Sequence, residues 1–365
     1  MWAVERTAGI NMRRAQSGMG IERASLKTLN RRQLLAFRDI APSDGESGLE
    51  TDCWLTVSRV AMACRFEVNI DSRGWQAVKA AGECLDEVDR LESILSIFRP
   101  RSELSRLNRE AATRPVLVGP ELLELLEMCK LLHEESEGAF DITTGSLTEC
   151  WGFQERSPKL PATELLASAR ERVGANRVCF GTEGSVSFKC ADLRINLGGV
   201  GKGYALDRGA AKISGHGIGT ALLSAGSSSV LALGAGPDGT GWHVGLRHPV
   251  LKDQRLATVR LCSCAMGTSS QEEQWFEQSG ERYGHILDPQ TGFPATRVRS
   301  ISVIADSAAR ADALATAFFV GGPELAARYC SRHEGVTAVM LLARDLHHPI
   351  VFGSSNQAIV EVVND

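Results

Sequence analysis

The sequence lacks a Cys-x-x-Cys pair, although ten cysteines are spread over its 365 residues. Cys262 and Cys264 are the closest two, and no second cysteine or histidine pair has zinc-site spacing, so a structural zinc site has little support. Excess charge of either sign is also missing, because 40 Lys and Arg against 44 Asp and Glu leave a formal charge of −4. This balance gives no electrostatic basis for nucleic-acid binding, and we expect no such partner.

Long apolar runs are absent as well. Charged residues interrupt every stretch that could otherwise cross a bilayer, so we expect no transmembrane segment, and residues 1–50 show no complete signal peptide. We predict a disordered, basic tail over residues 1–50 and a single domain over residues 51–365. The expected location is cytoplasmic, with export or membrane anchoring as the alternative if the N-terminus is misassigned.

Hydrophobic periodicity predicts an α+β fold with mixed sheets and flanking helices. Strand-like alternation from Trp54 to Ile70 is followed by helical spacing from Trp75 to Leu95. After Gly219 short strands dominate, including one run over residues 257–266. Strands and helices do not alternate strictly, which argues against a doubly wound parallel sheet. Further helices are predicted over residues 120–136, 162–173, 203–213, 308–319 and 323–333.

A glycine-rich turn, INLGGVGKGY, directly precedes a predicted helix at residues 195–204. Its backbone N–H groups could face an anion, and Lys202 would add a positive charge. The spacing is neither that of a Walker motif nor GxGxxG. A tight strand-to-helix turn without a ligand is an equally good interpretation of this stretch alone.

The run HILDPQTGFP, from His285 to Pro294, ends an apolar stretch in a turn rich in Asp, Pro and Gly. Because His285 stands just ahead of Asp288 and Thr291, its imidazole could act as a general base or contact a phosphate. The alternative is a structural histidine in an ordinary turn.

Asp312 and Thr316 are four residues apart in a helix of small residues, ADALATA, and therefore share one face. Two oxygens with little bulk around them can hold a hard cation such as Mg²⁺. The alternative is a helix cap at Asp312 and a solvent-facing Thr316.

The run GAFD, from Gly138 to Asp141, follows the second predicted helix. By itself it is read as a loop in which Asp141 caps the segment that follows.

Taken in order, these four motifs resemble those of the ApbE family of flavin transferases, over nearly all of residues 54–340. One such motif would be a weak signal, whereas several in the same order are specific. The further features that carry the resemblance are Met62 with Ala63, the run SELSRLN from Ser102 to Asn108, Ala225 with Gly226, and Thr268 with Ser269.

The resemblance implies that Asp312 and Thr316, with the backbone carbonyl of Gly199, coordinate Mg²⁺. It also implies that Lys202, His285 and Asp312 are catalytic. The residues implied to contact FAD are Met62, Phe98, Ala139, Phe140, Asp141, Asn196, Lys202 and His285.

The reaction that the resemblance implies splits FAD into AMP and an FMN unit, which a phosphoester joins to a threonine of a target flavoprotein. The expected partners are therefore FAD and that acceptor protein. The metal and Lys202 would neutralise charge on the pyrophosphate, while His285 would take the proton of the threonine. Two alternatives stay open, namely an FAD pyrophosphatase that gives FMN and AMP, and a non-catalytic FAD-binding or carrier protein.

Some positions depart from the family pattern. Asn196 replaces an aspartate, Phe98 replaces a tyrosine, and Cys64 replaces a threonine. Residues 227–229 are three serines where a glycine pair and an acidic or amide residue are usual. None of these positions is assigned to the metal or to the base, so we expect the chemistry to survive with altered FAD affinity or rate.

Overall fold

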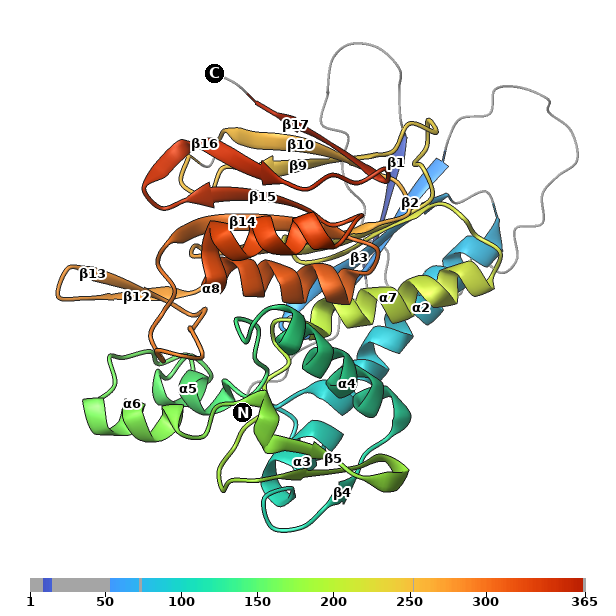
Figure 1. Cartoon of the computed structure of the whole chain (residues 1–365). Helices are drawn as coiled ribbons and strands as arrows, with labels where there is room; N and C mark the ends of the chain where they lie inside the picture. The colour runs from blue at the N-terminus through green and yellow to red at the C-terminus, as the bar shows by residue number, and fades with distance from the viewer. Residues whose placement is uncertain (1–8, 15–52, 72–73, 252, 364–365) are drawn as a thin grey trace, which may run out of the picture.

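A nine-stranded antiparallel sheet forms the centre of the computed structural model, which describes residues 9–14, 53–71, 74–251 and 253–363 (Figure 1). Of residues 9–14 only the backbone is described. In spatial order the strands are β1 (Gly9–Arg14), β2 (Cys53–Ala61), β3 (Cys64–Asp71), β7 (Ala221–Ala225), β8 (Ser229–Leu233), β11 (Ala265–Ser270), β14 (Val298–Ala305), β15 (Thr337–Leu342) and β16 (Asp345–Phe352). The predicted tail, residues 1–50, lies outside the described residues apart from β1 and stays a prediction.

Two runs that the sequence suggests as single strands are each two strands. Residues 54–70 form the hairpin β2–β3, whose turn is made by Met62 and Ala63 at φ 47° and 60°. Turns of this kind normally carry Asn or Gly, so no turn signal marks this one. Residues 257–266 divide in the same way into β10 (Arg255–Leu261) and β11, with Ser263 at φ 50° between them.

Three helices cover one face of the central sheet, α2 (Trp75–Leu95), α7 (Gly201–Gly215) and α8 (Ala308–Arg332) (Figure 1). In α2 the buried apolar residues recur at the predicted helical spacing, from Ala77 to Leu95. The two helices predicted over residues 308–319 and 323–333 occur as consecutive parts of α8, because Gly322 at φ 74° interrupts the helical backbone.

The other face of the sheet packs against a second, three-stranded sheet of β9 (Trp242–Arg247), β10 and β17 (Ala358–Val362). Between the two sheets lies a separate apolar core that includes Trp242, Val259 and Ile304. The layers are therefore helices, central sheet and small sheet, which confirms the predicted α+β class with mixed sheets and flanking helices.

The segment between α2 and α7 folds as a helical unit beside the layers (Figure 1). Its elements are α3 (Glu103–Glu110), α4 (Pro120–Glu135), α5 (Gly145–Cys150), α6 (Thr163–Arg170) and a small sheet of β4 (Val116–Leu117), β5 (Val178–Phe180) and β6 (Ser185–Phe188). The hairpin of β12 (Trp275–Gln278) and β13 (Glu281–Gly284) reaches this unit through tilted aromatic ring contacts with Trp151. The helical unit and the hairpin therefore contact each other beside the central sheet.

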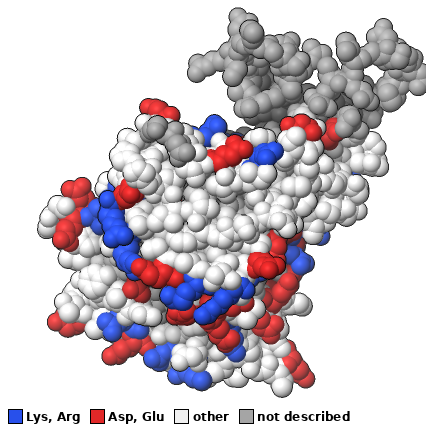
Figure 2. Space-filling model, turned by 45° about the horizontal axis from the view of Figure 1, so that its top comes forward, with Lys and Arg blue, Asp and Glu red and all other residues white. Residues whose placement is uncertain are grey.

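Positive and negative side chains lie interspersed on the face shown in Figure 2, so this face presents no patch of one sign. In the part of the chain that the structure describes, none of the helices combines the length and the apolar character of a membrane span.

Candidate active site

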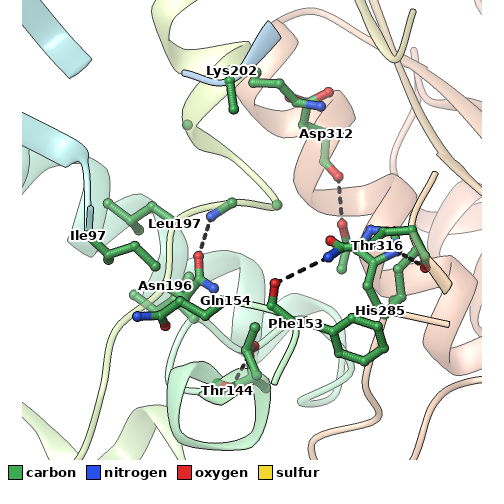
Figure 3. A pocket seen from close by; sticks show the side chains of 18 of the residues that line it. Ile97, Thr144, Phe153, Gln154, Asn196, Leu197, Lys202, His285, Asp312 and Thr316 are labelled. Carbon is green, nitrogen blue, oxygen red and sulfur yellow. Dashed lines mark hydrogen bonds between the residues drawn. The ribbon is translucent and has the colours of Figure 1, made fainter. Parts of the chain in front are cut away.

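A cavity of about 790 Å³ lies where the central sheet, the helical unit and the β12–β13 hairpin meet. Every residue that the sequence assigns to catalysis, FAD or metal lines it, although these residues come from six separate stretches of the chain. They are Met62, Phe98, Ala139, Phe140, Asp141, Asn196, Gly199, Lys202, His285, Asp312 and Thr316. In Figure 3, Asp312, Thr316 and His285 lie on one side of the cavity, and Ile97, Leu197 and Asn196 on the other.

One corner of the cavity depends on an unusually close approach of α8 to its neighbours. A Cβ on Gly203 of α7 would lie 2.1 Å from the backbone oxygen of Ala308. A Cβ on Gly267 of β11 would lie 2.6 Å from the backbone nitrogen of Asp312. Only glycine therefore lets α8 begin here, and this contact brings Asp312 beside the first turn of α7.

Asp312 is buried and its carboxylate is held by hydrogen bonds. The Gly203 N–H donates to Oδ2 at 2.8 Å, and the Ser229 hydroxyl lies 2.7 and 2.9 Å from the two carboxylate oxygens. Burial raises the pKa of Asp312 to about 7, against the opposing effect of the nearby positive charge of Lys202. The N-cap of α8 is Ser307, so the alternative that Asp312 caps this helix is wrong.

Thr316 and Gly199 lie at the same corner of the cavity. The Thr316 hydroxyl donates to the backbone oxygen of Asp312 at 3.2 Å, one turn earlier in α8, and lines the cavity. A Cβ on Gly199 would lie 3.1 Å from the Thr316 hydroxyl oxygen, so the glycine-rich turn passes directly against it. Among the described residues no three His, Cys, Asp or Glu side chains gather as metal ligands. One carboxylate with neutral oxygens suits Mg²⁺, which usually keeps waters and substrate phosphate oxygens in its shell.

Lys202 lies in the first turn of α7, at the positive end of the helix dipole, which favours an anion. Its ammonium group donates to the Ser228 hydroxyl at 2.5 Å. The glycine-rich turn therefore carries a cation into the cavity, and the interpretation of it as a turn without a ligand site is the weaker one.

His285 enters the cavity just after β13. Its Nδ1 lies 3.1 Å from the backbone oxygen of Gln274, so this nitrogen carries the proton and Nε2 is the basic one. Burial lowers the pKa of His285, which keeps the imidazole neutral near pH 7. Asp288 and Thr291, which follow it in sequence, bond to each other and close the turn.

The GAFD loop is anchored by its last residue. The Asp141 carboxylate accepts hydrogen bonds from the Thr143 N–H at 2.7 Å and the Ala175 N–H at 3.1 Å, so its side chain fastens the loop. Phe140 is buried, and Ala139 faces the cavity. Asn196 also stabilises its own loop. Its side-chain oxygen accepts a hydrogen bond from the Gly198 N–H at 2.9 Å, which shapes the glycine-rich turn.

The opposite wall is more open. Phe98 is 67% exposed at the edge of the cavity. The Met62 turn is held by α2, because its N–H donates to a Glu92 oxygen at 2.9 Å, and Arg99 bonds to the same carboxylate. Sequence reasoning missed Glu92, Arg99 and Gln274 as cavity residues. Glu92 gives no local signal, since the residue it holds lies 30 positions earlier in the chain.

Comparison with known proteins gives a consistent result. A sequence model of the ApbE family matches residues 62–341. The FAD:protein FMN transferase of Treponema pallidum is 32% identical over 298 residues, which cover 77% of this chain and 82% of that protein. The corresponding protein of Klebsiella pneumoniae is 31% identical, covering 75% of this chain and 79% of that protein.

Solved structures show the same likeness. The crystal structure of the ApbE protein from Thermotoga maritima superposes with a TM-score of 0.75 at 29% identity, over 82% of this chain and 97% of that one. The flavin transferase ApbE from Vibrio cholerae superposes with a TM-score of 0.73 at 25% identity, over 82% of this chain and 96% of that one.

Proposed function

The chain belongs to the ApbE family, and from this membership we propose that it transfers the FMN part of FAD to a threonine of an acceptor flavoprotein, with Mg²⁺ and release of AMP. Transfer of FMN from FAD to protein is the activity of its relatives, and the chain is a transferase of this kind. The metal, the threonine and the role of each residue are the parts that we add.

One observation carries these additions. Residues from the glycine-rich turn, the His285 segment and α8, which are far apart in sequence, place a cation, a neutral imidazole and a buried carboxylate on one cavity. This set matches the demands of phosphoryl transfer, in which charge must be neutralised, the reacting groups aligned and a proton removed.

Lys202 and the first turn of α7 would hold the FAD pyrophosphate. Lys202 brings its ammonium charge to the cavity, and the first turn of α7 adds the positive end of the helix dipole, so together they suit a negatively charged pyrophosphate. Asp312, Thr316 and the Gly199 carbonyl would hold Mg²⁺. When bound there, the metal supplies further charge neutralisation at the pyrophosphate oxygens.

His285 would be the general base. Its Nε2 accepts the proton of the acceptor threonine while the threonine oxygen forms a bond to the phosphorus on the FMN side. The bond between that phosphorus and the bridging oxygen breaks, and AMP leaves with the bridging oxygen. The hydrogen bond from Nδ1 to the Gln274 carbonyl keeps the ring in the required tautomer and orientation.

The departures from the family pattern leave this constellation in place. Phe98 keeps an aromatic ring at the edge of the cavity, and Asn196 keeps a side-chain oxygen for the Gly198 N–H. We therefore expect them to affect the binding of FAD more than the chemical step.

The test is to incubate the full chain with FAD and Mg²⁺, with and without an acceptor domain that carries the target threonine. We expect AMP together with an FMN-sized mass gain on the acceptor, and no mass gain when that threonine is replaced by valine. AMP with free FMN in both samples would show a pyrophosphatase instead. FAD binding without AMP would show a carrier protein, and either result would overturn the proposal.

A further inference from the structure

Two adjacent serines at the start of β8 contact the two opposite charges of the cavity. Ser228 and Ser229 are 6% and 0% exposed. The Ser228 hydroxyl accepts from the Lys202 ammonium group at 2.5 Å, and the Ser229 hydroxyl donates to Asp312. We propose that this serine pair positions the two charged side chains, an inference that rests on the proposed function. Ser229 aligns Asp312 for a divalent cation, and Ser228 aligns Lys202 for the FAD pyrophosphate.

The backbone explains how neighbouring residues reach the same corner. Ala225 pairs with Ser229 at the end of the β7–β8 hairpin, and the turn between them contains Gly226 at φ 62°. Ser229 is therefore a strand residue, whereas Ser228 still belongs to the turn. The Thr268 N–H donates to the Ser228 backbone oxygen at 2.7 Å, which fixes the turn against β11.

The geometry at Asp312 leaves room for a metal. The single proton of the Ser229 hydroxyl is shared between the two carboxylate oxygens, at 2.7 and 2.9 Å, and the Gly203 N–H takes one further position on Oδ2. An ionised carboxylate has about four acceptor positions. The serine therefore fixes the rotation of the carboxylate without using up its capacity to bind a cation.

The same pair keeps two opposite charges apart. Asp312 and Lys202 are close enough for each to influence the other electrostatically. In the described part of the chain, however, the Lys202 ammonium group bonds to Ser228, and the Asp312 carboxylate bonds to Ser229 and Gly203. In a direct ion pair, Lys202 and Asp312 would neutralise each other and bind their ligands less strongly. Because each bonds to a serine hydroxyl instead, Lys202 stays available for the pyrophosphate and Asp312 for the cation.

The experiment measures Mn²⁺ binding to the full chain by the electron spin resonance signal of free Mn²⁺, without acceptor and without turnover. We expect Ser229→Ala to weaken Mn²⁺ binding about tenfold, as for other residues that orient a metal ligand. Ser228→Ala should keep the Mn²⁺ affinity of the wild type and weaken FAD binding about fivefold, the loss of one hydrogen bond. Each variant thus serves as the control of the other.

Ser146→Ala is the matched control for the loss of a buried hydroxyl. Ser146 is 4% exposed, and its hydroxyl donates to the Asp192 backbone oxygen at 3.0 Å, away from the cavity lining. It should leave both affinities unchanged. If Ser229→Ala does not fold, Ser229→Cys keeps nearly the same volume with a much weaker donor, and should show the same loss of Mn²⁺ affinity.

Three results would each overturn the positioning role. They are a wild-type Mn²⁺ affinity in the folded Ser229 variant, an equal loss of Mn²⁺ affinity in Ser146→Ala, and no Mn²⁺ binding by the wild type. Since this assay needs no transfer, its result is separate from the test of the transferase. A wild type that binds Mn²⁺ in the expected pattern but forms no flavinylated acceptor would contradict the proposed function alone.

Discussion

The two ends of the cavity are built in different ways. One end, made of Gly199, Lys202, Asp312 and Thr316, is the proposed metal site and is called the metal corner. There two helices and a strand meet so closely that glycine is required between them. At the open rim, by contrast, the side chain of Phe98 is 67% exposed. The corner tolerates little change without moving α8, whereas the rim can vary in sequence.

The departures from the family pattern follow this difference. Phe98 lies at the rim, where replacing a ring by a similar ring costs little. The serines at 227–229 lie at the corner, and there two of the three replacements form direct hydrogen bonds to Lys202 and Asp312. In this chain the corner serines thus bond directly to both charged groups, whereas Phe98 is largely exposed at the rim.

The largest effect is expected from removing the charge at the corner. Asp312→Asn should lower the rate of AMP release about a thousandfold, because a neutral amide neither holds the cation nor balances Lys202 in a buried site. The rate is measured with saturating FAD and acceptor over a range of Mg²⁺ concentrations. Asp306→Asn, with a side chain 70% exposed just before α8, is the control and should keep full activity.

The next largest effect concerns His285. A base acts in its neutral form, and burial lowers the pKa of His285 below its usual value of 6.5. As the pH falls, the neutral form therefore persists past pH 6.5. At Mg²⁺ concentrations high enough to keep Asp312 ionised, kcat/KM should therefore decline only below that value. His285→Ala should lower kcat/KM about a hundredfold or more and abolish this decline. A decline centred above pH 6.5 in the wild type, or one that survives in the variant, would contradict the assignment.

A smaller effect is expected from crowding the contact between α7 and α8. Gly203→Ala places a Cβ 2.1 Å from the Ala308 oxygen, so α8 must shift. We expect a loss of about 1 to 3 kcal/mol in the free energy of unfolding, measured by urea denaturation, together with reduced transfer. Gly215→Ala, at the other end of α7, meets no atom within 4 Å and should leave stability unchanged or slightly raised.

The smallest effect is expected at the rim. Phe98→Ala should weaken FAD binding about two- to tenfold, the value of one aromatic contact, with little change in kcat. Phe98→Tyr should bind FAD at least as tightly as the wild type. Trp75→Ala removes an aromatic side chain that is 71% exposed and does not line the cavity, and should leave FAD titrations unchanged.

The corner could be predicted from the sequence because its signals are local. Asp312 and Thr316 share a face by helical spacing, and the glycine-rich turn with Lys202 correctly marks the start of a helix. The strand expected before this turn is absent, because residues 195–200 form loop and turn between β6 and α7. The rim and the supporting contacts could not be predicted in this way. The Met62 turn has φ 47° without a glycine, and what holds it is Glu92 on another element. The hydrogen bond from Ser229 to Asp312 joins residues 83 positions apart. Sequence periodicity indicates only local contacts and cannot predict this one.

The central claim is that the metal corner performs the chemical step and the rim binds the flavin. It is tested most directly by single-turnover AMP release at increasing FAD concentration, for the wild type, Asp312→Asn and Phe98→Ala, with Mg²⁺ and acceptor in excess. We expect Asp312→Asn to lower the limiting rate at saturating FAD, and Phe98→Ala to raise the FAD concentration needed for half of that rate. The reverse pattern, or the same change in both variants, would contradict the division between the two ends.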